Sequence, residues 1–444
     1  MTGEPSMLSK CLGEFVGTFL LIFTVGCNVL GGTAVWGAVS IACVLMVSIY
    51  ALGGVSGANF NSAVSLSLAI TNALGGPGGM DWKTCGIYCG TQLAAGVIAG
   101  LCYTGLFWNS FNLAPAKGFG ILQVGVTELL YTFMLCFVVL NVAVAKKTQY
   151  YGLAIGFVIV AGAYGAAPIG AGCFNPAVAF AIDTSSAFIG FGYCLAYIAF
   201  ELVGAALAAV VFKLVRPDQF GGEPTLVSKL ISEFLGTFFL VLTVGLNVLG
   251  NSPAGAYSIA AALMCMIYAL GDVSGAHFNP AVTGAVLLCG RDKISPQDAG
   301  AYMGTQIVAG LTAGFTYRLL HGGDSFALGP AGDYSWGQVS IAESVFTFVL
   351  CFVVLSVAIS DKTAAPEMFG LAIGSCVTVG GFAIGGISGG SLNPAVSLGI
   401  SVSHFSQAYT GLFYTLFEFI GAAAASQVFK LTHAVDVEKY ASKV

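Results

Sequence analysis

The chain has 444 residues, of which 57% are hydrophobic and only 8% are charged, whereas soluble domains carry about 25% charged residues. This composition excludes an ordinary soluble protein and predicts an integral, multi-pass membrane protein surrounded by lipid. The net charge of −5 is dispersed and no basic run is present that could bind nucleic acid, so no nucleic-acid partner is expected.

Twelve apolar runs come close to the roughly 20 residues that cross a bilayer. In the first half they cover residues 10–30, 36–53, 83–106, 120–143, 151–167 and 189–213. In the second half they cover residues 228–249, 255–271, 297–319, 337–358, 367–386 and 406–429. The stretch 213–230 is the most polar long segment and reads as a linker. We therefore expect two domains, residues 1–219 and 220–444.

Four related motifs interrupt these runs: NFNSAV (59–64), CFNPAV (173–178), HFNPAV (277–282) and SLNPAV (391–396). Their Asn residues are 114 positions apart within each half, and the two halves are offset by 218, so the chain is a duplication of a duplication. Each motif heads an apolar segment too short to span the membrane. Non-helical backbone at membrane depth is tolerated only where protein buries it or it lines a water-filled cavity. The motifs therefore predict four re-entrant half-helices beside cavities.

An Asn followed by Pro suits the start of a helix. The Asn side chain accepts from the first free backbone N–H groups, and Pro at the first helical position leaves no donor unpaired. The amino end of such a helix carries about half a positive charge. Four copies at matched spacing favour a functional element over an ordinary capped helix.

The thirteen cysteines lie mostly in apolar segments, which favours buried thiols over a disulfide framework. Cys85 and Cys89 have no nearby His or second Cys pair to complete a metal site, so no metal is expected. In the twelve-span layout thirteen Lys and Arg residues lie on one side, and only Lys117 and Arg318 lie on the other. The positive-inside rule then places both termini on the cytoplasmic or an equivalent side.

With Glu14, Glu128, Glu233 and Glu343 in the first and fourth spans of each half, these motifs resemble the aquaporins, the major intrinsic protein family of water and small-solute channels. The resemblance covers about residues 8–216 and 227–432. It implies an all-α polytopic fold of two aquaporin-like six-helix bundles, each with two re-entrant half-helices and inverted-repeat symmetry. It also implies no enzymatic activity and no cofactor. Because the family forms tetramers, it implies a homo-oligomer, a dimer with pseudo-fourfold symmetry, or a subunit of a larger membrane complex.

In the family, two half-helices meet head to head and their Asn amides donate to a passing solute oxygen. Carried over, the pore motifs are Asn61, Ser62 and Ala63 with Asn175, Pro176 and Ala177, and Asn279, Pro280 and Ala281 with Asn393, Pro394 and Ala395. The resemblance implies that four buried glutamates of the spans brace the loops: Glu14, Glu128, Glu233 and Glu343. We expect the same role for Gln92, Gln306, Glu201 and Glu418, because Glu201 and Glu418 align with Gln92 and Gln306 across the internal repeat. Glu201 and Glu418 stand where the family commonly has Pro, and a proton-coupled role is the alternative for this pair.

The chain departs from the family after the second Asn-Pro-Ala of each half, where Val178 and Val396 replace the usual Arg. Counting from the Asn residues predicts one selectivity filter of Ile41, Ala163, Gly172 and Val178, and another of Ile259, Gly381, Gly390 and Val396. Both filters are small, aliphatic and uncharged, so we expect them to be wide and dry and to lack the cation barrier of an Arg. Ser62 replaces the first Pro, which sets the first pore apart.

The predicted function is a passive channel for water or small neutral solutes of the glycerol, urea, ammonia or peroxide class. An apolar constriction can dewet, so a poorly conducting structural subunit of a larger membrane assembly remains an alternative. A secondary transporter is a third possibility, and it would need ion-coupling groups such as Glu201 and Glu418 to face an aqueous cavity.

Overall fold

The computed structural model describes residues 4–33 and 35–434, and the regular structure of these residues is entirely helical. Contacts divide the chain into two compact units, Met1–Glu223 and Pro224–Val444. The sequence places the domain boundary a few residues earlier, at 219/220. Each unit is described below by itself.

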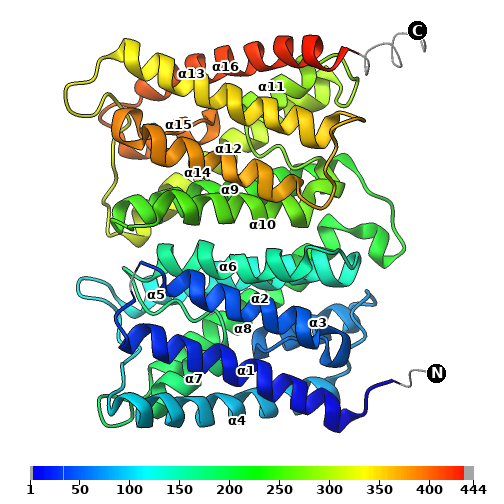
Figure 1. Ribbon diagram of the computed structural model, residues 1–444, viewed down its shortest axis with the longest axis vertical. Coiled ribbons are helices and arrows are strands. Elements are labelled where there is room, and N and C mark those ends of the chain that lie inside the picture. The colour runs from blue at the N-terminus through cyan, green and yellow to red at the C-terminus, as the bar shows by residue number, and fades with distance from the viewer. Residues whose placement is uncertain (1–3, 34, 435–444) are drawn as a thin grey trace. The chain divides into compact units, whose positions relative to one another are not determined.

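The first unit contains eight α-helices in its described part (Figure 1). They are α1 (Met7–Leu30), α2 (Gly37–Ser56), α3 (Ser62–Ala73), α4 (Trp82–Phe107), α5 (Ile121–Val139), α6 (Tyr151–Ala166), α7 (Pro176–Ser185) and α8 (Tyr193–Val215). A π-helical turn, Leu140–Ala145, extends α5, and a 3₁₀ turn, Pro217–Phe220, follows α8.

The second unit repeats this order in its described part. Its helices are α9 (Leu226–Leu249), α10 (Gly255–Ser274), α11 (Pro280–Leu288), α12 (Pro296–Leu320), α13 (Trp336–Val354), α14 (Phe369–Ser388), α15 (Pro394–His404) and α16 (Thr410–Thr432). A π-helical turn, Leu355–Ile359, extends α13 as its counterpart extends α5. Two long helices, a short one and a long one thus occur twice in each unit.

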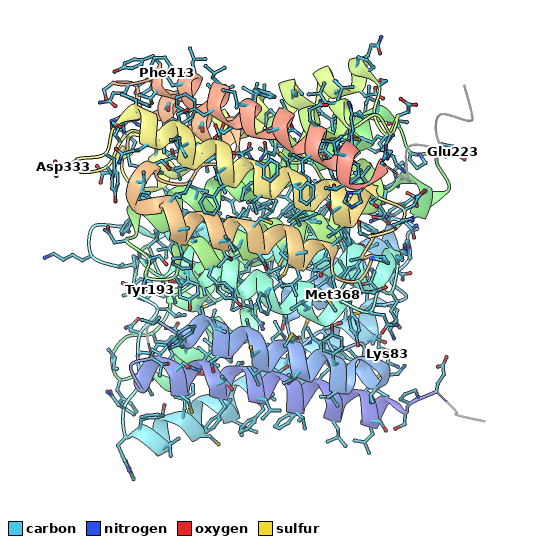
Figure 2. The ribbon with its side chains drawn as sticks, turned by 45° about the horizontal axis from the view of Figure 1, so that its top comes forward. Lys83, Tyr193, Glu223, Asp333, Met368 and Phe413 are labelled. Atoms are coloured by element: carbon cyan, nitrogen blue, oxygen red, sulfur yellow. The ribbon has the colours of Figure 1, made fainter. Side chains whose placement is uncertain are left out.

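Ten helices of the described chain are long and apolar enough to cross a membrane. Two expected spans fall outside this set for different reasons. α6 has only 16 residues, which at 1.5 Å per residue is about 24 Å. α12 has 25 residues but includes the polar start Pro296–Asp298 and several Thr and Gly residues, which lower its apolarity. Exposed charged side chains such as Lys83, Glu223 and Asp333 lie at or beyond helix ends (Figure 2).

Within each unit the long helices run alongside one another in matching pairs (Figure 1). α1 packs on α2 and α4, α5 packs on α8, and the second unit repeats these pairs as α9 with α10 and α12, and α13 with α16. The short helices lie between such pairs: α3 and α7 both contact α4 and α8, and α11 and α15 both contact α12 and α16. The chain therefore inserts both short helices of a unit into the same interior.

A close helix approach in the second unit depends on two glycines. A Cβ at Gly310 of α12 would lie 2.2 Å from the Ala395 carbonyl oxygen, and a Cβ at Gly399 of α15 would lie 2.5 Å from the Gly310 carbonyl oxygen. Backbone therefore packs directly on backbone. In a membrane, where lipid gives no hydrophobic drive between helices, such small-residue contacts carry much of the packing.

Gly310→Ala is expected to destabilise the protein by about 1–3 kcal/mol, because the backbone oxygen of Ala395 cannot give way as a flexible side chain could. The measurement is the thermal transition of the full chain in detergent, with the fraction of protein that stays monodisperse as the signal. Gly304→Ala is the matched control, because it lies on an exposed face of the same helix with no atom within 4 Å of the added Cβ. Equal transitions for the two variants would contradict the close packing of α12 and α15.

Candidate functional site

Each short helix begins directly after a motif Asn, whose extended backbone ends the loop. Asn61 has φ −153° and ψ 123°, and its Oδ1 accepts from the Ala63 N–H at 2.8 Å. The other three Asn residues cap their helices in the same way, at 3.0 Å to Ala177, 2.8 Å to Ala281 and 2.9 Å to Ala395. Pro176, Pro280 and Pro394 take the first helical position, and Ser62 takes it in α3.

The amide nitrogens of the Asn residues join the two loops of each unit. Asn61 Nδ2 donates to the Phe174 carbonyl at 2.8 Å, and Asn175 Nδ2 donates to the Phe60 carbonyl at 2.9 Å. The second unit has the same reciprocal pair. Asn279 Nδ2 donates to Leu392 and Asn393 Nδ2 donates to Phe278, both at 2.9 Å. Because an amide carries two N–H donors, this bond uses only one of them.

The residue before each Asn adopts a left-handed backbone conformation that residues other than glycine rarely take. The φ angles are 51° at Phe60 and Phe174, 50° at Phe278 and 56° at Leu392. Such a conformation costs on the order of 1–3 kcal/mol and persists only where the surroundings enforce it.

A buried glutamate holds the N–H of each strained residue. Glu14 Oε2 accepts from Phe60 N and Glu128 Oε2 accepts from Phe174 N, both at 2.7 Å. In the second unit Glu233 accepts from Phe278 N at 2.7 Å and Glu343 accepts from Leu392 N at 3.0 Å. The other oxygen of each carboxylate accepts from the preceding residue, Asn59, Cys173, His277 or Ser391. Two backbone donors therefore end on every one of these four glutamates.

Gln92 and Gln306 brace the first loop of each unit through the same glutamates. Gln92 Nε2 donates to Glu14 Oε2 at 2.9 Å, and Gln306 Nε2 donates to Glu233 Oε2 at 2.7 Å. Gln92 Oε1 accepts from the Ser62 hydroxyl at 3.0 Å. The serine that replaces proline at the first helical position of α3 is thus tied to α4.

Glu201 and Glu418 contact the motif Asn residues of the second loops. Glu201 Oε1 accepts from Asn175 N at 2.8 Å, and Glu418 Oε1 accepts from Asn393 N at 2.9 Å. Glu418 Oε1 also accepts from the Ser397 hydroxyl at 2.7 Å. The structure therefore brings all eight of the predicted bracing residues to the loops.

The sequence reasoning missed a serine that reinforces three of the four glutamates. The hydroxyls of Ser56, Ser274 and Ser388 donate to Glu14, Glu233 and Glu343 at 2.7, 2.6 and 2.6 Å. Each serine lies five positions before its motif Asn. The remaining loop, which contains Asn175, has Gly170 at that position. Recurrence at that spacing was the signal that could have identified them.

A cavity of about 370 Å³ in the first unit receives both motif Asn residues. The four predicted filter residues, Ile41, Ala163, Gly172 and Val178, all line it. The remaining wall is mainly aliphatic, with the polar side chains of Asn59, Asn112 and Tyr151.

The corresponding cavity of the second unit is larger, about 750 Å³, and contains Asn279 and Asn393. Its predicted filter residues, Ile259, Gly381, Gly390 and Val396, also line it. It has additional polar lining on its walls: Asn247, Asn251, Ser252, His277, Ser388, Ser391 and Gln407.

Neither cavity has a Lys, Arg, Asp or Glu among the described residues that line it. Both cavities are lined by the Asn amides at the amino ends of the short helices, where the helix dipole is positive. This arrangement offers hydrogen-bond donors to a neutral oxygen and no counter-charge for an ion. Glu201 and Glu418 line neither cavity.

Comparison with known proteins gives a consistent result. A model of the family described as Major intrinsic protein matches residues 1–212 and 222–429. The chain is 34% identical over 227 residues to Aquaporin NIP1-2 of Arabidopsis thaliana, covering 47% of this chain and 76% of that protein. It is 37% identical over 219 residues to Aquaporin NIP1-4 of Oryza sativa subsp. japonica, covering 47% of this chain and 77% of that protein. A solved structure, the aquaglyceroporin from Plasmodium falciparum, is 20% identical and covers 46% of this chain and 96% of that one, with a TM-score of 0.42.

Glu233→Ala is expected to destabilise the first loop of the second unit and so lower the thermal stability of the protein, because it leaves the N–H groups of His277 and Phe278 without their acceptor. Each buried donor left unsatisfied costs about 1–3 kcal/mol. The measurement is the thermal transition of the full chain in detergent. Glu367→Ala is the control, because Glu367 is exposed and outside the loops. A transition for Glu233→Ala that matches the control would show that this carboxylate does not hold the loop.

Proposed function

The chain belongs to the major intrinsic protein family, as a tandem fusion of two aquaporin domains, and from this premise we propose that each half is a separate passive pore for small neutral solutes. The protein is a multi-pass membrane channel for water or small solutes at the level of the family. The finer proposal is that both pores admit neutral solutes of the glycerol and urea class as well as water.

The observation that supports this proposal most strongly is the chemistry of the cavity walls. Both are aliphatic at the four filter positions and free of charged side chains in their described lining. An Arg at Val178 or Val396 would narrow the passage and repel cations. With valine there, the carbon skeleton of a polyol or urea can pass against apolar walls while its oxygens meet the Asn amides.

The second N–H of each Asn amide is the proposed contact for the solute. In each unit the Oδ1 atoms are used in capping, and one N–H of each amide joins the partner loop. We propose that the remaining donors of the two Asn residues bind the same solute oxygen. A water molecule held in this way points its own hydrogens outward, so it cannot relay a proton through the pore.

The positions of Glu201 and Glu418 support a passive pore over an ion-coupled transporter. A transporter needs ionisable groups that an ion can reach in the permeation path. Both carboxyls are fully buried and lie outside the two cavities.

We further propose that both termini lie on the cytoplasmic or an equivalent side, because thirteen of the fifteen Lys and Arg residues fall on that side of the layout. Two copies of the chain would together supply four pores, which is the basis for expecting a dimer of pseudo-fourfold symmetry.

Proteoliposomes containing the full chain are expected to change volume faster than empty vesicles in stopped-flow mixing. Water should leave them faster under an osmotic gradient, and they should re-swell faster when the added solute is glycerol or urea. Flux should follow the solute gradient and be indifferent to an imposed proton gradient. The double variant Asn175→Leu with Asn393→Leu is the control for pore-dependent flux. No flux above empty vesicles for any of the three would reject the channel for these solutes and favour a structural role.

Val178→Arg and Val396→Arg test the filter assignment. Each introduces a charge and a long side chain at the predicted filter of one pore, and an Arg in an apolar membrane setting costs about 2.5–3.5 kcal/mol. Glycerol flux should fall by the share that each half carries, and the double variant should approach the level of empty vesicles. Leu122→Arg, on an exposed position of α5 near the helix end, serves as the control. Unchanged glycerol flux in the double variant would show that the filter lies elsewhere.

A further inference from the structure

Glu201 and Glu418 occupy the position in the second loop that a glutamine occupies in the first. In each unit the first loop is held by a glutamate on one helix and a glutamine on its neighbour, Glu14 of α1 with Gln92 of α4. The helix pair α5 and α8 corresponds to α1 and α4 by the internal repeat. It carries Glu128 with Glu201, so a second acid stands where the first pair has an amide.

The glutamine uses both of its polar atoms. Gln92 Oε1 accepts from the Ser62 hydroxyl, and its Nε2 donates to Glu14 Oε2 at 2.9 Å. Gln306 repeats this, with Oε1 accepting from Thr283 and Nε2 donating to Glu233 at 2.7 Å. The brace therefore needs one acceptor and one donor on the same side-chain end.

In Glu201 and Glu418 one carboxyl oxygen acts as an acceptor, and the other oxygen has no hydrogen-bond partner. Oε1 of each accepts the N–H of the motif Asn, whereas Glu201 Oε2 and Glu418 Oε2 are buried atoms with no hydrogen-bond donor. Both residues are fully buried. An ionised oxygen in that position would be a desolvated charge with nothing to stabilise it.

Among the described residues, no Lys, Arg or His is found in the set of groups that act on these carboxyls. Glu201 interacts electrostatically with Glu128 and Cys136 of α5, Cys173 of the loop and Tyr197 of α8. The corresponding groups around Glu418 are Glu343, Cys351 and Tyr414, and the hydroxyls of Ser391 and Ser397 also lie beside this carboxyl. Two adjacent buried carboxyls cannot both ionise at ordinary cost, and such pairs share a single proton.

The hydrogen bonds indicate which acid holds that proton. Both oxygens of Glu128 already accept backbone N–H groups, from Cys173 at 2.9 Å and Phe174 at 2.7 Å, so Glu128 is the ionised partner. Glu343 likewise accepts on both oxygens, from Ser391 and Leu392. In each pair the oxygen that accepts no hydrogen bond is Oε2 of Glu201 or Glu418, and it is the one best placed to carry the hydrogen.

We propose that Glu201 and Glu418 are neutral carboxylic acids that position the second pore Asn of each unit. Oε1 accepts the N–H of Asn175 or Asn393, and the Oε2 hydroxyl donates to Glu128 or Glu343, in place of the glutamine amide of the first loop. Each pair then carries one negative charge and one proton. The inference concerns the support of the loops and is independent of which solute passes.

Infrared difference spectroscopy of the full chain in proteoliposomes at neutral pH tests the protonation. The spectrum of the wild type minus that of the double variant Glu201→Gln with Glu418→Gln should contain the carbonyl stretch of a protonated carboxylic acid, shifted by deuterium exchange. Glu223→Gln, which removes an exposed carboxylate, should remove only carboxylate absorption. A wild-type spectrum without a protonated-acid band that the double variant removes would overturn the proposal.

Flux through the first unit separates a neutral acid from a buried charge. Measured in the Val396→Arg background to suppress the second pore, Glu201→Gln should retain wild-type water and glycerol flux, because glutamine supplies the same acceptor and donor. Glu201→Leu, of similar size but without either, should lose most of the flux. If Glu201→Gln loses as much flux as Glu201→Leu, the charge itself is required and the proposal is wrong. The infrared result stands apart from flux, so it tests the inference even if these solutes do not permeate.

Discussion

The hydrogen bond from a strained backbone N–H to a buried glutamate is the interaction on which each pore loop depends. Phe60, Phe174, Phe278 and Leu392 take a left-handed backbone, and this turn points the next residue, the Asn, toward the cavity. Without a fixed acceptor the turn would relax to a commoner conformation. Burying a carboxylate in a membrane costs free energy, and so does burying backbone N–H groups without acceptors. The hydrogen bonds between them offset both costs.

The two units apply the same scheme with different details, and some of the differences lie in the cavity walls. Ala163 of the first unit corresponds to Gly381 of the second, and Cys173 corresponds to Ser391. The second cavity is also about twice as large, 750 against 370 Å³. Three of the four filter positions are nevertheless the same in both units, Ile41 and Ile259, Gly172 and Gly390, and Val178 and Val396. The difference in cavity size therefore lies mainly elsewhere in the walls.

Much of this arrangement follows from the sequence, because its causes are local or periodic. The Asn residues could be expected at helix starts since capping involves residues two apart, and the spans follow from runs of apolar residues. The reciprocal bonds from Asn61 to Phe174 and from Asn175 to Phe60 could not be read in this way. They join residues more than a hundred positions apart and depend on how two loops meet. The expected run 151–167 already matches the short helix α6, Tyr151–Ala166, and the polar residues of α12 are visible in the sequence, so both deviations from an ideal span are local features.

The reciprocal Asn bonds also bear on how the protein is made. Asn61 donates to a carbonyl 113 residues later in the chain, so the first loop cannot reach its final form until the second loop has left the ribosome and entered the bilayer. Until then the short helix α3 is a polar-ended segment without its partner. Because both bonds of a unit close within that unit, the first can complete its interior while the second is still being synthesised. Tandem fusion therefore lengthens the polypeptide without lengthening the interval during which any one loop waits.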